Sequence, residues 1–111
     1  MAHPLLLLAD NDENDCLFLR RAVKKLGVLN PLEEVQTGQE VLDYFKRKGR
    51  FANRTAYLQG VILLLDVHLP SPSGVDVLRW IRRDQPSELI GVLLWTGSSS
   101  PGEKLAISIV A

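Results

Sequence analysis

The sequence predicts an α/β fold in which helices cover both faces of a doubly wound parallel sheet. Short apolar runs of strand length, such as Leu5–Leu8 and Val61–Leu65, alternate with longer segments of helical periodicity. The resulting order, β-α-β-α-β-α-β, is typical of a parallel sheet with crossover helices. The chain has 111 residues and neither a linker nor an internal repeat. These observations indicate a single domain that spans residues 1–111.

The first strand is expected at Leu5–Leu8, because a continuously apolar run is typical of a strand that is buried on both faces. Apolar residues then recur at helical spacing from 19 to 26. Asn11 or Asp12 can cap the start of this helix, and Gly27 can end it. The sequence therefore predicts the first β-α unit within residues 5–27.

The second unit is less clearly marked. Residues 31–36 form a short, weak strand candidate, and a second helix opens at Thr37 and Gly38 and stops at Gly49. The segment Arg50–Gln59 is polar and basic, and we expect it to be a surface loop.

The third and fourth strands are better defined. Val61–Leu65 is the clearest buried strand, and the turn at 69–74 follows it closely. A third helix carries apolar residues at helical spacing over 75–81. The fourth strand is expected at Leu89–Trp95, which completes four strands and three helices.

Composition excludes several classes of protein. Thirteen basic residues balance thirteen acidic ones, which argues against a general nucleic-acid binder. The chain has no apolar run of the length that crosses a membrane, and no basic segment precedes an N-terminal apolar run as in a signal peptide. The single cysteine, Cys16, indicates a reducing compartment, and we expect it to be buried and inert. A cytoplasmic protein that contacts neither membrane nor nucleic acid is the simplest expectation.

Three polar residues follow three different strands: Asp10, Asp66 and Thr96. Because the carboxyl ends of parallel strands meet at one edge of a sheet, we expect these residues to converge there, where such folds bind ligands. Two carboxylates suit Mg²⁺ together with a phosphoryl group. The Thr96 hydroxyl and the backbone N–H groups around Gly97 would stabilise charge on the transferred oxygens. The alternative is that Asp10 and Thr96 only cap helices.

Three motifs carry a family resemblance: LLLLADNDEND at Leu5–Asp15, VILLLDVHLPSPSG at Val61–Gly74 and VLLWTGSS at Val92–Ser99. Together they resemble the receiver domains of two-component response regulators, over roughly Pro4–Ser100. The segment LDYFKRKG and the loop after it look like the stand-alone receivers that accompany bacteriophytochrome-type histidine kinases. The resemblance implies a flavodoxin-like fold.

The resemblance also implies roles for individual residues. Asp66 matches the phosphoacceptor, and Asp10 matches the acidic residue that ligates Mg²⁺ directly. His68 stands where the family offers a backbone carbonyl to the metal, and Thr96 stands where a hydroxyl contacts the phosphoryl group. The partner that the resemblance implies is a sensor histidine kinase, with a phytochrome-like kinase as the narrower form of this expectation. The implied catalysis is at most self-phosphorylation from a phosphohistidine donor and autodephosphorylation.

One departure from the family pattern lies at the metal site. Ala9 occupies a position that is usually acidic, so we expect weaker Mg²⁺ binding than the family norm. Replacing Ala9 with Asp or Glu should then tighten Mg²⁺ binding.

The other departure lies in the C-terminal part. Only 15 residues follow Thr96, so we expect the family's last strand, its lysine and the last helix to be missing, and Lys104 lies too early to replace that lysine. The apolar tail at 105–111 could be a helix stub or a strand. As a strand, it could cover the edge of the fourth strand in its own chain or, by exchange, in a homodimer. A truncated gene product is an equal alternative.

Two other functions remain open. A receiver-like module that binds partners without phosphorylation is favoured by Ala9 and by the missing lysine. A phosphohydrolase of the haloacid-dehalogenase type is disfavoured, because His68 stands where that family has a second aspartate.

Overall fold

The computed structural model describes residues 3–55, 59–84, 89–95 and 108–110. The predicted order of alternating strands and helices is confirmed. The elements are β1 (Leu5–Ala9), α1 (Glu13–Lys25), β2 (Leu32–Val35), α2 (Gly38–Lys46), the 3-10 helix η1 (Gly49–Phe51), β3 (Val61–Asp66), α3 (Gly74–Asp84), β4 (Ile90–Trp95) and β5 (Ser108–Val110).

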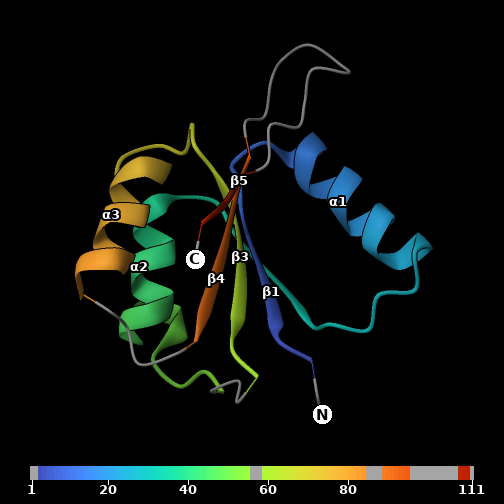
Figure 1. The fold of residues 1–111 in the computed structure, drawn as a ribbon, viewed down its shortest axis with the longest axis horizontal. Coiled ribbons are helices and arrows are strands. Elements are labelled where there is room, and N and C mark those ends of the chain that lie inside the picture. The colour runs from blue at the N-terminus through green and yellow to red at the C-terminus, as the bar shows by residue number, and fades with distance from the viewer. Residues whose placement is uncertain (1–2, 56–58, 85–88, 96–107, 111) are drawn as a thin grey trace.

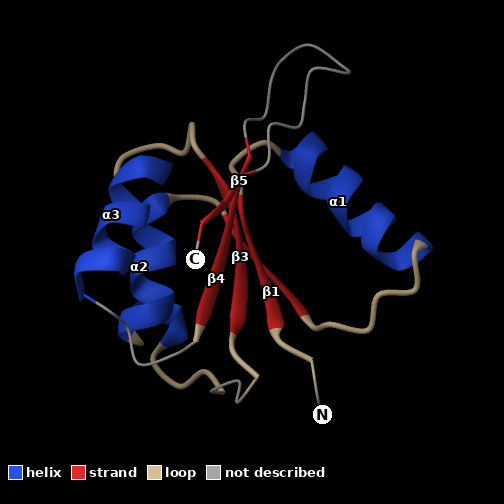
Figure 2. Ribbon diagram, viewed as in Figure 1, coloured by secondary structure: helices blue, strands red, loops and turns tan. Residues whose placement is uncertain are grey.

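The sheet has the strand order β2-β1-β3-β4-β5, and the first four strands are parallel. Helix α1 covers one face of the sheet, and α2 and α3 cover the other (Figure 1). The predicted doubly wound α/β class is therefore confirmed, and the carboxyl ends of the parallel strands meet at the upper edge in Figure 2. None of the described helices is long and apolar enough to cross a membrane.

The two faces of the sheet are not covered equally. A small cluster forms under α1 from Leu8 and Cys16, with Leu19, Leu32 and Leu64 packed against it. Burial raises the pKa of the Cys16 thiol to about 11, so the prediction of a buried, unreactive cysteine is supported. The larger cluster lies under α2 and α3 and contains Leu5, Leu7, Ala9, Val35, Val41, Tyr44, Phe45, Phe51, Val61, Leu63, Leu65, Leu69, Val77, Ile81 and Val92.

Helix α1 begins as predicted. The Asp12 side chain accepts hydrogen bonds from the backbone N–H groups of Asn14 and Asp15, at 2.8 and 3.4 Å. Gly27, with φ of 70°, follows its end. Leu26, the last residue of the predicted apolar periodicity, is the C-cap of this helix, and its side chain is exposed.

Helix α2 starts at the predicted cap, where Thr37 Oγ1 accepts a hydrogen bond from Glu40 N at 3.0 Å. It ends at Lys46, before the predicted stop at Gly49, because Arg47 adopts a left-handed conformation with φ of 58°. The chain then forms η1, whose Phe51 is only 5% exposed. The prediction of a surface loop is therefore wrong for this residue, because its ring packs edge-on against Tyr44, with centroids 5.1 Å apart.

Arg50 joins η1 to the edge strand β2. Its guanidinium donates to the Glu34 carbonyl oxygen at 3.1 Å and pairs with Glu40 at 3.4 Å. The same group lies over the Phe51 ring, 4.4 Å from its centroid. Arg50 thus satisfies an outward-facing carbonyl of an edge strand, which would otherwise be open to pairing with another chain.

The tail supplies a fifth strand. Strand β5 pairs with β4 in antiparallel direction, with Leu94 opposite Ser108 and Val92 opposite Val110. The expectation of only four strands is therefore incomplete. The structure supports the alternative in which the tail covers the β4 edge in its own chain.

Gly74 allows α3 to begin directly against the end of β3. A Cβ atom at this position would overlap the Asp66 carbonyl oxygen and lie 2.7 Å from Val67 Cα. We expect Gly74→Ala to lower the free energy of unfolding by about 1–3 kcal/mol, because both obstacles are backbone atoms. Gly91→Ala is the control, because a Cβ atom there would meet nothing within 4 Å. Equal urea midpoints for the two variants would contradict this prediction.

Candidate functional site

Strands β1 and β3 bring two carboxylates to the same edge of the sheet. The two strands are paired in register, with Ala9 opposite Leu65, so Asp10 and Asp66 follow as neighbours. Asp10 is fully buried and Asp66 is only 4% exposed. Among the described residues, these two are the buried charged side chains. Two adjacent buried carboxylates repel each other and therefore need a compensating positive charge or a proton.

Asp10 is held by hydrogen bonds on one side only. Its backbone N–H donates to the Val35 carbonyl at 3.1 Å, and its Oδ1 accepts a hydrogen bond from Asp12 N at 2.9 Å. Its Oδ2 is buried and has no hydrogen-bond donor in the part of the chain that the structure describes.

The ionisation of Asp10 is strongly perturbed. Its pKa is raised from the ordinary 3.8 to about 7, chiefly by burial and in addition by the negative charges of Asp66 and Asp15. The hydrogen bond from Asp12 N opposes this shift but does not cancel it. When protonated, Asp10 also forms a hydrogen bond with Asp15, which favours the neutral form. Near neutral pH, Asp10 is therefore poised between its charged and neutral forms.

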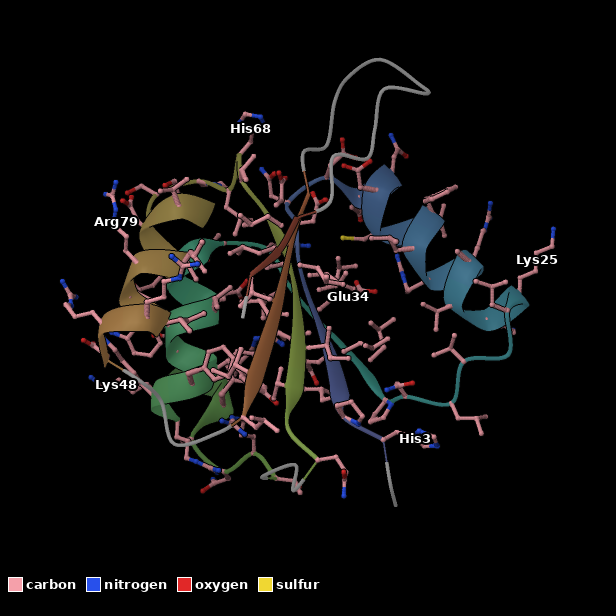
Figure 3. The ribbon with its side chains drawn as sticks, in the orientation of Figure 1. His3, Lys25, Glu34, Lys48, His68 and Arg79 are labelled. Atoms are coloured by element: carbon pink, nitrogen blue, oxygen red, sulfur yellow. The ribbon has the colours of Figure 1, made fainter. Side chains whose placement is uncertain are left out.

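Asp66 is oriented by the loop that follows it. Its Oδ1 accepts a hydrogen bond from His68 N at 2.9 Å, and its carbonyl oxygen accepts one from Leu69 N at 3.4 Å. The His68 side chain is exposed and points away from the ribbon at the edge where β3 ends (Figure 3). The structure thus brings Asp10, Asp66 and the His68 backbone together at one edge.

The remaining predicted site residues, Thr96 and Gly97, lie outside the described residues. Strand β4 is described as far as Trp95, whose backbone pairs with Asp66. The last described residue of β4 therefore stands beside the proposed phosphoacceptor.

The donor set at this edge fits one hard cation. No group of three or more His, Cys, Asp and Glu side chains that could hold a metal ion occurs within the described ranges. Asp10 and Asp66 nevertheless supply two carboxylates, and Asp10 Oδ2 lacks a donor among the described residues. Mg²⁺ commonly takes only one or two protein carboxylates and completes its shell with water and phosphate oxygens. Ala9, which is fully buried, adds no ligand.

Sequence reasoning did not single out Asp15 as part of this site. It contributes through its charge and its hydrogen bond with protonated Asp10. Asp15 lies three residues after the N-cap Asp12, so the first turn of α1 directs it back toward the end of β1. The spacing between a cap residue and an acidic residue in the first turn was the available signal.

Comparison with known proteins identifies the class of protein that shares this fold. The chain has the fold of response regulator receiver domains, as its strand order and its similarity to solved receivers show. It is similar to the bacteriophytochrome response regulator RtBRR, with 30% identity and a TM-score of 0.73, over 85% of this chain and 55% of that one. It is also similar to the bacteriophytochrome response regulator AtBRR, with 27% identity and a TM-score of 0.77, over 89% of this chain and 70% of that one.

One curated protein is also similar: the probable methanogenesis regulatory protein FilR2 of Methanothrix harundinacea. The two are 29% identical over 99 residues, which cover 86% of this chain and 59% of FilR2. The chain therefore spans little more than half the length of FilR2 and of RtBRR. No model of a known protein family matches the chain.

Two more distant structures share the fold; one is of a phosphorylated response regulator and the other of a Mn(2+)-bound one. The phosphorylated cyanobacterial phytochrome response regulator RcpA is 24% identical, with a TM-score of 0.71 over 89% of this chain and 69% of that one. The Mn(2+)-bound form of response regulator Rcp1 is 20% identical, with a TM-score of 0.71 over 88% of this chain and 68% of that one. At these identities the likeness concerns the fold alone.

Proposed function

We propose that this receiver domain is a phosphoacceptor module, in which Asp66 takes a phosphoryl group from a phosphohistidine of a sensor histidine kinase. The observation that carries the proposal is the buried pair of Asp10 and Asp66 at the edge where β1 and β3 end. Such a pair has little structural value by itself, because burying two like charges is unfavourable. A site that binds a cation and a phosphoryl group accounts for the pair.

In the proposed reaction, a carboxylate oxygen of Asp66 attacks the phosphorus atom of the phosphohistidine. The oxygen–phosphorus bond forms, and the nitrogen–phosphorus bond breaks. The imidazole nitrogen keeps the electron pair of that bond and takes up a proton. Because His68 N already donates to Oδ1, the carboxylate has a fixed orientation, and we assign the attack to Oδ2.

A divalent cation fits the same site. Asp10, Asp66 and the main-chain carbonyl of His68 would hold Mg²⁺, which supplies positive charge that screens the carboxylates and the phosphoryl oxygens. Asp10 must give up its proton to act as a ligand, and its pKa of about 7 places this step near neutral pH.

The remaining parts of the proposal concern the surroundings of Asp66. The Thr96 hydroxyl and the Gly97 backbone N–H are assigned to the phosphoryl oxygens. The similarity to bacteriophytochrome response regulators supports a phytochrome-type histidine kinase as the donor. One buried cysteine agrees with action in the cytoplasm. Catalysis by the chain itself would be limited to its own phosphorylation and dephosphorylation.

The test is incubation of the protein with Mg²⁺ and a small phosphodonor, followed by measurement of the intact mass. We expect wild type to gain one phosphoryl group and Asp66→Asn to gain none. Asp76→Asn is the matched control, because Asp76 is an exposed carboxylate at the start of α3, and it should be modified as wild type is. Modification of Asp66→Asn at the wild-type level would contradict the proposal.

One observation favours a second candidate function, a receiver that binds partners without being phosphorylated. Ala9 is fully buried within the core where receivers usually carry an acidic residue, so the site has one ligand fewer. The mass experiment separates the two functions, because a non-phosphorylated module gains no phosphoryl group in any variant.

We expect Ala9→Asp to tighten Mg²⁺ binding, because a third carboxylate at this edge raises the negative charge that a cation neutralises. The same change should destabilise the metal-free protein by several kcal/mol, since position 9 is fully buried among apolar side chains. Titration with Mg²⁺ and urea denaturation without metal measure the two effects. An unchanged dissociation constant in a folded variant would contradict the expectation.

A further inference from the structure

Two helices begin at the edge of the sheet that carries the candidate site. Figure 1 shows that α2 and α3 both start at the end of the sheet where β3 ends. The chain leaves β3 at Asp66, crosses this edge through residues 67–73 and enters α3 at Gly74. We call residues 67–73 the site loop, because they directly follow the proposed phosphoacceptor.

The site loop comes very close to the first residue of α2. A Cβ atom on Gly38 would lie 1.9 Å from the Pro72 carbonyl oxygen and 2.9 Å from its carbonyl carbon, whereas ordinary contact begins at 3.4 Å. Gly38 is not one of the glycines with positive φ, so its backbone conformation does not require glycine. Helix formation does not require it either, since alanine is the better helix former. The approach of the Pro72 carbonyl is therefore the reason for a glycine at this position.

The start of α2 is held firmly in place. Glu40 N donates to Thr37 Oγ1 at 3.0 Å, and Gln36 N donates to Glu40 Oε1 at 2.7 Å. Val41, in the same turn, is fully buried. A side chain at position 38 would therefore displace the site loop rather than the helix.

The far end of the site loop is also held. Ser73 N donates to Asp76 Oδ2 and Asp76 N donates to Ser73 Oγ, each at 3.2 Å, and Val77 N donates to the Ser73 carbonyl at 2.9 Å. These bonds join the end of the loop to the first turn of α3. A displacement of Pro72 is therefore transmitted back along the loop, toward His68.

The first part of the site loop carries polar groups of the candidate site. His68 N donates to Asp66 Oδ1 at 2.9 Å, and Leu69 N donates to the Asp66 carbonyl at 3.4 Å. The second bond is already long, so a small displacement of the loop is enough to break it. The position of the loop thus determines both the orientation of the Asp66 carboxylate and the position of the His68 carbonyl.

We propose that Gly38 is a positioning residue of the cation site. By admitting the Pro72 carbonyl, it sets the place of the site loop and thereby of the His68 N–H and carbonyl groups. The carbonyl is the main-chain ligand assigned to Mg²⁺ above, so the link to the cation rests on the proposed function. Helix α2 thus influences the cation through the site loop, although it supplies none of the assigned ligands.

The first test measures the amide hydrogen exchange of His68 in the metal-free protein by NMR, relative to the amide of Leu63 in the middle of β3. We expect Gly38→Ala to raise this relative rate at least tenfold, because the displaced loop loses the bond from His68 N to Asp66. Ile81→Val is the matched control. It also disturbs packing, but Ile81 lies near the far end of α3, so the relative rate should stay as in wild type. An unchanged rate in Gly38→Ala overturns the proposal, since Gly38 then only allows the helix to pack.

A second variant, Pro72→Gly, covers the case in which Gly38→Ala does not fold. It keeps Gly38 and adds no atoms, but it gives the backbone at position 72 more freedom to leave its place beside α2. We expect it to raise the relative exchange rate of His68 as well. A rate equal to that of wild type overturns the proposed route through the Pro72 carbonyl.

The last test is titration of the same folded variants with Mg²⁺. We expect Gly38→Ala to weaken Mg²⁺ binding at least fivefold, and Ile81→Val to bind as wild type does. Faster exchange of His68 with unchanged Mg²⁺ affinity overturns the link between the site loop and the cation, and so does a wild type that binds no Mg²⁺. The titration needs no phosphodonor, so a wild type that binds Mg²⁺ but gains no phosphoryl group contradicts the proposed phosphorylation and not this inference.

Discussion

In the absence of metal, the free energy of unfolding of wild type should fall by a few kcal/mol as the pH rises from about 4 to about 7, and Asp10→Asn should remove most of this fall. Burial raises the pKa of Asp10 to about 7 in the folded state, whereas the unfolded chain has the ordinary value of 3.8. Between these values folded Asp10 binds more protons than unfolded Asp10, so its contribution to stability is highest at low pH and is lost as the pH rises toward about 7.

Mg²⁺ should reverse this effect. A bound cation favours the ionised form of Asp10, so added Mg²⁺ should stabilise wild type more at about pH 8 than at about pH 5. Asp10→Asn keeps the shape of the side chain but has no ionisable carboxylate. Without metal it should therefore be more stable than wild type at about pH 8, and it should not respond to Mg²⁺.

Urea denaturation at several pH values, with and without Mg²⁺, measures both the pH dependence of stability and the stabilisation by Mg²⁺. Asp12→Asn is the matched control, because Asp12 is an exposed carboxylate two residues away and Asn caps a helix equally well. This control should retain the pH dependence and the Mg²⁺ response of wild type. A flat stability profile in wild type, or a full Mg²⁺ response in Asp10→Asn, would show that Asp10 is not the group responsible.

Phe51→Ala should lower the free energy of unfolding by about 3–5 kcal/mol, the usual effect of removing a buried aromatic ring. The Phe51 ring is 5% exposed, packs edge-on against Tyr44 at 5.1 Å and lies beneath the Arg50 guanidinium. Its loss leaves a cavity beside Tyr44 and removes the surface on which Arg50 rests while it contacts the edge of β2.

Phe18→Ala is the control of the same residue type. Phe18 is 64% exposed on α1, so its truncation should change the free energy of unfolding by no more than about 0.5 kcal/mol. Thermal or urea unfolding at low protein concentration gives both values. Similar effects for the two variants would mean that Phe51 is not part of the core.

Much of the fold could be predicted because its signals are local. The apolar runs at Leu5–Leu8 and Val61–Leu65 have no polar residue that could face water and have the length of strands, which favours strands that are covered on both sides. Asp12 and Thr37 are helix caps whose side chains bond to backbone groups only two or three residues away. Such local interactions can be predicted from the order of the residues alone.

Other features could not be predicted, because they depend on distant partners. Phe51 stands in a basic, polar segment, and only Tyr44 and the core under α2 make it a buried residue. Leu26 fits the apolar periodicity of α1, yet the helix ends just before it and leaves it exposed. The pairing of β5 with β4 could be offered only as one of several alternatives for the tail, because no local pattern connects these residues.

For the candidate site, the sequence by itself determined the residue types and their places at the ends of strands. Asp10 and Asp66 follow apolar runs, and parallel strands must end at a common edge, so their meeting followed from the strand order. Only the tertiary structure decided that Asp10 is buried, that one of its oxygens has no donor in the described part of the chain, and that its pKa lies near 7. Burial and electrostatic fields are sums over neighbours from several elements, among them Asp15 of α1 and Asp66 of β3, and these neighbours come together only on folding.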